Sequence, residues 1–94
     1  MSSTYAYNDL DPPLPTDKPS EVQTFVRSYF VRKFPKMGGK EMATIMESAE
    51  VPGHVLYSLN LESMKGLFGN KGAVLYQFLN ESKYGYVRYL SYKH

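Results

Sequence analysis

The sequence contains no cysteine and no tryptophan among its 94 residues. Without cysteine the chain can form neither a disulfide nor a thiolate metal site, and nothing indicates an oxidising compartment. Its apolar runs are much shorter than the roughly 20 residues needed to span a bilayer, so we expect no membrane span. The first residues have neither the basic region nor the apolar core of a signal peptide. We therefore expect a soluble protein of the cytoplasm or the nucleus.

The chain also lacks a strong excess of either charge. It has 11 basic and 9 acidic residues, for a formal net charge of +2, whereas nucleic-acid-binding domains usually have a marked basic excess. Hydrophobic residues make up 43%, which is ordinary for a globular protein and too high for a disordered one. A chain of this length is expected to form one domain with a modest core.

No arrangement of residues with catalytic or metal-binding chemistry stands out. The two histidines, His54 and His94, are far apart in the sequence, and a metal site needs several ligands at defined spacing. Gly66, Gly69 and Gly72 recur at every third residue without the Gly-Lys-Ser/Thr ending of a phosphate-binding loop. No nucleophile with a partner and no acid–base pair can be named. We therefore expect no enzyme, no cofactor and no metal.

Residues 1–18 are interpreted as a proline-rich arm. They contain Pro12, Pro13 and Pro15, and Pro19 follows directly. Because proline fixes φ and removes a hydrogen-bond donor, we expect this segment to be extended and to pack little. Whether its few apolar residues dock on the domain or stay free is left open; they are Tyr5, Tyr7, Leu10 and Leu14. The run of prolines is also typical of a polyproline ligand for an aromatic groove, but a linker that enters a domain is the favoured interpretation.

Apolar residues at helical spacing predict five helices after the arm. The first begins near Ser20, which with Gln23 has the pattern of a capping box, and it ends before Pro35. The others are expected at Lys40–Glu50, at His54–Leu59, from an N-cap at Asn60 to Phe68, and at Lys71–Tyr84 with Gly85 as the closing residue. The expected inner faces are Val22, Phe25, Val26 and Tyr29; Met42, Ile45, Met46 and Ala49; Leu61, Met64 and Phe68; and Val74, Leu75, Phe78 and Leu79. The expected fold class is thus all-α.

Two segments resemble the sterile alpha motif (SAM) domain. Residues 19–26 resemble its opening pattern, P-x-x-V-x-x-W-L, with Phe25 at the tryptophan position. Residues 56–60, followed by Met64, Gly72 and Val74, resemble the segment that leads into its last helix. The resemblance implies a compact five-helix SAM-like bundle over residues 19–85, preceded by the arm and followed by a tail at residues 86–94.

Within that superfamily, Leu56–Asn60 and Gly72–Gln77 most resemble the C-terminal helical domain of the epidermal growth factor receptor pathway substrate eight family. Proteins of that family use this domain on actin filaments. The resemblance implies a non-catalytic protein–protein interaction domain, an adaptor in signalling, with actin or another SAM-like domain as its partner.

A cluster of basic residues at the end of the first predicted helix is the main candidate binding site. It consists of Arg27, Arg32, Lys33, Lys36 and Lys40, and no acidic residue lies between Arg32 and Lys40. Such a patch could meet an acidic protein surface, a phospholipid or RNA. The alternative is a solvated helix end whose cations suit the C-terminal dipole. Both interpretations stay open at this point.

The SAM resemblance implies a second pair of candidate surfaces. SAM domains often associate through an acidic surface in the middle of one molecule and the start of the last helix of another. Here the acidic residues are Glu47, Glu50 and Glu62, and the helix-start residues are Asn70 and Lys71, where free amides attract anions. A single lysine is a small charge, so we expect weak self-association at most.

The tail, Tyr86–His94, alternates aromatic and basic residues. Single-stranded nucleic-acid binders use this composition for stacking and for charge. RNA binding through the tail and the Lys36 region is therefore the alternative function. Docking of the tail on its own domain or on a partner is the favoured interpretation, since exposed apolar groups are unfavourable.

Overall fold

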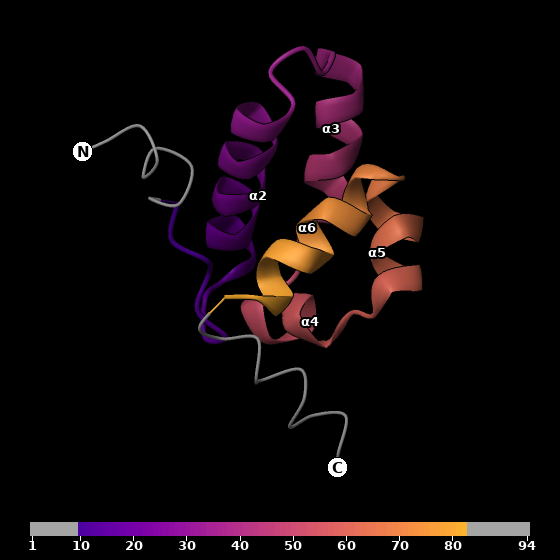
Figure 1. Cartoon of the computed structure of the whole chain (residues 1–94). Coiled ribbons are helices and arrows are strands. Elements are labelled where there is room, and N and C mark those ends of the chain that lie inside the picture. The colour runs from indigo at the N-terminus through magenta and orange to yellow at the C-terminus, as the bar shows by residue number, and fades with distance from the viewer. Residues whose placement is uncertain (1–9, 83–94) are drawn as a thin grey trace, which may run out of the picture.

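The computed structural model describes residues 10–82, which form five helices and no strand (Figure 1). The helices are α2 (Pro19–Lys33), α3 (Gly39–Ser48), α4 (Gly53–Ser58), α5 (Leu61–Phe68) and α6 (Lys71–Asn80). In Figure 1, α2 and α3 stand side by side and are joined at their upper ends, with α4 at the foot and α6 between α2 and α5. The prediction of an all-α fold with five helices is confirmed.

The first helix, α2, begins one residue earlier than predicted. Pro19 occupies the first helical position, where its fixed φ suits the helix and its missing N–H costs nothing. The Glu21 carboxylate accepts a hydrogen bond from the Lys18 amide at 2.8 Å. Ser20 therefore lies inside the first turn, and the predicted capping box at Ser20 and Gln23 is wrong. The helix ends before Pro35, as predicted.

The last helix, α6, is shorter than predicted. It ends at Asn80 because the Leu79 carbonyl accepts hydrogen bonds from both the amide of Ser82, at 3.2 Å, and its hydroxyl, at 2.7 Å. These bonds satisfy that carbonyl without a further helical turn. Helix α3 likewise ends two residues early, at Ser48. The predicted cap at Gly85 and the tail at residues 86–94 lie outside the described residues.

The predicted N-cap of α5 at Asn60 is confirmed, because the Asn60 side-chain oxygen accepts a hydrogen bond from the Ser63 amide at 2.8 Å.

The connection between α5 and α6 depends on two glycines. Gly69 has φ 74°, a region that favours glycine. A Cβ on Gly72 would lie 2.2 Å from the Met64 carbonyl oxygen. The start of α6 therefore packs against the backbone of α5 at a distance that only glycine permits.

The core lies where the inner faces of all five helices meet. Most of the predicted inner-face residues are buried, and Phe25, at the SAM tryptophan position, is only 6% exposed. Phe30 is fully buried although the sequence did not single it out. The prediction that Leu61 is buried is wrong, since it is 39% exposed. Four further inner-face residues are only partly buried against the core: Met42, Met46, Val74 and Phe78.

Residues 10–18 pack against the helices instead of extending into solvent. The Tyr57 hydroxyl donates a buried hydrogen bond to the Pro13 carbonyl at 2.7 Å. The Gly53 amide donates to the Asp17 carbonyl at 3.0 Å, and Leu10 packs against the core. Prolines lack a donor but keep a carbonyl acceptor, and Tyr57 uses that acceptor. The prediction that the arm packs little is therefore wrong for this part of it.

No helix within residues 10–82 has the length and apolar character required to cross a lipid bilayer.

Candidate functional site

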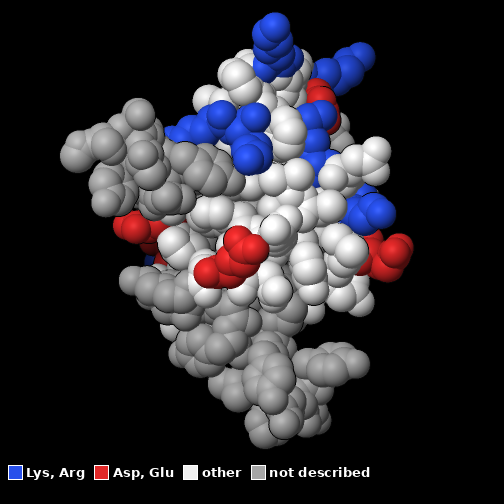
Figure 2. All heavy atoms as spheres, in the orientation of Figure 1, with Lys and Arg blue, Asp and Glu red and all other residues white. Residues whose placement is uncertain are grey.

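Exposed cations gather where α2 ends and α3 begins. Arg32, Lys33, Lys36 and Lys40 are all exposed in this region. Figure 2 shows lysine and arginine side chains over the upper part of the molecule, where Figure 1 places the loop between α2 and α3. The structure thus brings four of the five residues of the predicted basic cluster to one end of the molecule.

A groove of about 440 Å³ lies at this end, between the α2–α3 loop and the start of α6. Its floor is apolar, because Phe34 and Met37 lie in it half-buried and pack against the core. Its lining residues are Lys33, Phe34, Pro35, Lys36, Met37, Gly38, Glu41 and Lys71. We name this surface the Phe34 groove.

Lys71 joins the start of α6 to the start of α3 within the Phe34 groove. Its ammonium nitrogen lies 3.0 Å from Glu41 Oε2 and 5.3 Å from the centroid of the Phe34 ring. The two side chains of the ion pair are 32% and 46% exposed, so solvent screens the pair and it contributes about 0–1 kcal/mol to stability. Lys71 therefore places its positive charge at the start of α6, as predicted, but the Glu41 carboxylate partly neutralises that charge.

The Phe34 groove carries an excess of positive charge. Three lysines and one glutamate line it, and the glutamate is already paired with Lys71. An aromatic floor supplies apolar contact area, and lysines at the rim supply attraction to carboxylates. This chemistry suits an acidic protein segment that carries an apolar side chain.

Arg27 lies outside the Phe34 groove. It lines a separate shallow depression between α2 and α3 together with Gln23 and Met46, and the Gln23 side-chain amide donates to the Met46 carbonyl at 2.7 Å. The predicted cluster is therefore divided. Arg32 and Lys40 are exposed at the same end of the molecule but do not line the groove.

Two of the acidic residues that the SAM resemblance implies lie at the other end of α3. Glu47 and Glu50 are exposed at and beyond its last turn, and the rise of about 1.5 Å per residue places Glu47 about 9 Å along the helix axis from Glu41. Asn70 is the N-cap residue of α6, but its side chain makes no capping hydrogen bond. The predicted acidic and helix-start surfaces are thus distinct regions of the molecule.

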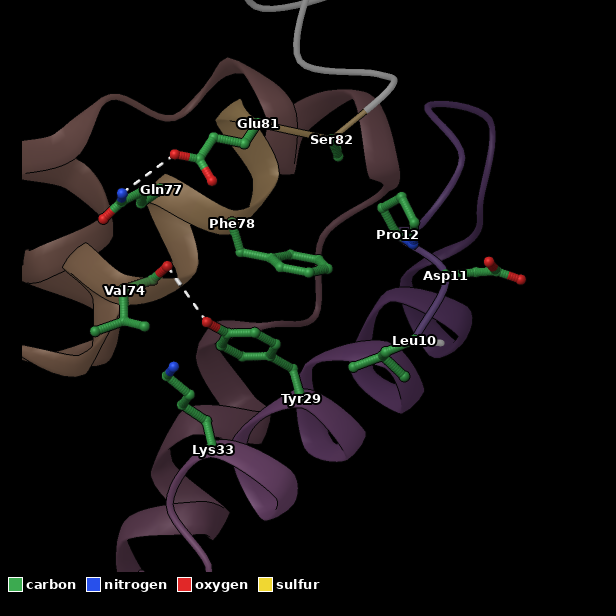
Figure 3. A pocket seen from close by; sticks show the side chains of 10 residues that line it. All are labelled: Leu10, Asp11, Pro12, Tyr29, Lys33, Val74, Gln77, Phe78, Glu81 and Ser82. Atoms are coloured by element: carbon green, nitrogen blue, oxygen red, sulfur yellow. Dashed lines mark hydrogen bonds between the residues drawn. The ribbon is translucent and has the colours of Figure 1, made fainter. Parts of the chain in front are cut away.

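A second hollow, of about 560 Å³, lies between the start of the described chain, α2 and α6 (Figure 3). Tyr29 and Phe78 face each other in it, with ring centroids 5.0 Å apart, and the Tyr29 hydroxyl donates to the Val74 carbonyl at 3.4 Å. Leu10 closes one side. The sequence did not predict this hollow, because it depends on the arm returning over α2.

The two floor residues of the Phe34 groove were not predicted as site residues from the sequence. Phe34 and Met37 lie in a loop, outside any helical apolar pattern, so the spacing of apolar residues did not select them. The sequence feature that could have identified Phe34 is its position as an aromatic residue directly before Pro35 in a basic segment. Phe34 is half-buried there and packs against the core.

Metal-ligating side chains do not gather in the described part of the chain. Within residues 10–82 no group of three or more histidines, aspartates or glutamates could hold a metal ion. His54 is exposed near the start of α4, and His94 lies outside the described residues.

Comparisons with models of protein families, with curated proteins and with solved structures gave no match to this chain. The SAM resemblance therefore stays a prediction from the two sequence segments that carry it.

Proposed function

We propose that the chain is a non-catalytic protein–protein interaction domain of the SAM type, which binds an acidic surface of a partner protein in the Phe34 groove. The observation that carries this proposal is the combination of an apolar floor, Phe34 and Met37, with a lysine rim. Interfaces combine an apolar centre with a polar rim in the same way.

The floor and the rim have different roles in the proposed binding. A half-buried aromatic ring is the kind of residue that provides much of the binding energy in an interface. The lysines contribute more to the association rate and to partner choice than to affinity. Binding through this groove should therefore weaken with salt without being abolished by it, because the apolar contact is not screened.

Three features support the SAM type. The helix number and order match the expectation from the resemblance. Phe25 is a core residue at the position of the SAM tryptophan. Gly72 packs against α5 at the start of the last helix. On the same resemblance, actin is the first candidate partner, and a role as a signalling adaptor in the cytoplasm or nucleus is part of the proposal.

Co-sedimentation with filamentous actin tests this proposal. The chain should pellet with filaments, and Lys36→Glu should reduce the bound fraction, because it reverses a charge on the rim of the Phe34 groove. Arg27→Glu is the matched control, since it makes the same change in net charge outside the groove. This control should bind like the unmodified chain.

Three other outcomes would contradict the proposed partner or the proposed binding site. If the unmodified chain does not pellet, actin is not the partner. If the two variants lose binding equally, the groove is not the binding site. Equal loss with a steep dependence on salt would instead be the behaviour of a non-specific polyanion binder, as the RNA-binding alternative requires.

A further inference from the structure

A rigid turn, Leu14–Asp17, lies directly before α2. The Asp17 amide donates to the Leu14 carbonyl at 3.0 Å, and the Leu14 amide donates to Asp17 Oδ2 at 3.0 Å. Pro13 and Pro15 fix φ on either side of Leu14. The turn is anchored to the domain through the buried bond between Tyr57 and Pro13. We name it the Leu14 turn.

The Leu14 turn has an apolar tip in acidic surroundings. The Leu14 side chain is 44% exposed. The hollow beside it is lined by Asp11, Asp17 and Glu21 and by no lysine or arginine. The turn therefore presents an exposed leucine among carboxylates.

This chemistry is complementary to that of the Phe34 groove. The groove has an apolar floor, three lysines and one glutamate. The turn has an apolar side chain, and the turn and the hollow beside it together have three carboxylates, with the exposed Lys18 as the adjoining cation. The two surfaces lie at opposite ends of α2, whose 15 residues span about 22 Å. Because the helix holds them apart, a turn cannot reach the groove of its own chain.

We propose that the Leu14 turn of one copy of this chain docks in the Phe34 groove of a second copy. This inference rests on the proposed function, since it takes the groove as the binding site, and it names a partner for that site. Unlike surfaces meet in this contact, so each copy keeps one turn or one groove unoccupied. Such a head-to-tail contact extends into an open chain unless its rotation closes a ring.

The contact should be weak but specific. One leucine and a few charges bury less than the roughly 1,200 Å² that marks a stable interface. The rigidity of the turn reduces the entropy lost on binding, and the charge pairs at the rim should make the association weaker at high salt.

Sedimentation velocity over a range of concentrations tests the inference. Leu14→Arg removes the apolar tip and puts a cation opposite the lysines, and Lys36→Glu puts a carboxylate opposite the acidic turn. Each variant alone should associate about tenfold or more weakly than the unmodified chain. An equal mixture should form dimers and no larger species, because only one intact turn and one intact groove remain per pair.

Leu61→Arg is the matched control for the turn variant. Leu61 is exposed to a similar extent, 39% against 44%, and it lines neither surface. It should associate like the unmodified chain. Asp11→Lys, at another exposed position of the acidic surroundings, repeats the test should Leu14→Arg lose its helical circular dichroism.

The outcomes separate this inference from the proposed function. A monomeric unmodified chain overturns the inference, and actin binding by the Lys36→Glu variant still decides the proposed function. Loss of association in Lys36→Glu, with normal association in Leu14→Arg and Asp11→Lys, also overturns it, because the groove then binds something other than the turn. Unchanged association in all variants overturns it as well.

Discussion

At the residue scale, Gly72 sets the distance between α5 and α6. A Cβ there would meet the carbonyl oxygen and carbon of Met64 at 2.2 and 2.7 Å, and these are backbone atoms that cannot rotate away. Gly72→Ala should therefore destabilise the domain by about 1–3 kcal/mol or more, as overpacking does. Urea denaturation measures the change in the free energy of unfolding.

Gly66→Ala is the control for this prediction. Gly66 is also helical, but a Cβ on it would meet nothing within 4 Å. Replacement of an exposed helical glycine by alanine should raise stability by about 0.5–1 kcal/mol. Similar effects of the two substitutions would mean that the approach of α6 to α5 is not as close as described.

The wrong prediction that Leu61 is buried is also explained at the residue scale. Its spacing from Met64 and Phe68 places it on the same face of a helix, and both of those residues are buried. Leu61 is the first residue of an eight-residue helix, so it extends past the end of the core and is 39% exposed. Periodicity identifies a face, but it does not say how far along that face the neighbouring helices reach.

At the scale of elements, the apolar pattern predicted the number and order of the helices but not all of their ends. The Asn60 cap was predictable because a side chain makes it. The start of α2 at Pro19 and the end of α6 at Asn80 depend on proline geometry and on bonds to the Leu79 carbonyl. A capping pattern in the sequence does not show which of several possible residues will begin or end the helix.

The arm shows a different limit at this scale. Its prolines indicated an extended segment, and the segment does lack helices before Pro19. Nothing in its sequence showed that Tyr57, some forty residues later, would donate to the Pro13 carbonyl, a contact spanning 44 positions. Long-range packing of this kind follows from the assembled fold, which places α4 beside the arm.

Truncation of the arm gives a prediction for this element. A chain that begins at Pro19 loses the Pro13 acceptor and the bond from Gly53 to Asp17. It should be less stable than a chain that begins at Leu10 by roughly 3 kcal/mol, which lowers the melting temperature by about 10 °C or more. Thermal circular dichroism of the two chains measures the difference.

Tyr57→Phe in the chain that begins at Leu10 is the control for truncation. It removes one hydroxyl and leaves the Pro13 carbonyl without its buried donor, at a cost of about 1–3 kcal/mol. Equal melting temperatures for the chains that begin at Leu10 and at Pro19 would show that the arm is only a linker.

At the scale of the whole molecule, the candidate site was predicted in part. The cations at the end of α2 were visible in the sequence, and four of the five gather at one end. The groove itself was not predictable, because its floor comes from a loop and its rim includes Lys71 and Glu41 from two other helices. For the same reason the separation of Arg27 from the cluster became apparent only in the fold.

In the proposed contact between two copies, the two ends of α2 bind each other as complementary surfaces. The most direct measurement is a series of ¹⁵N–¹H correlation spectra of the chain from dilute to millimolar concentration. We expect concentration-dependent shifts of two groups of amides, those of Lys33–Glu41 with Lys71 and those of Leu14 and Asp17. Spectra that do not change with concentration, or that change only around Glu47 and Glu50, would contradict it.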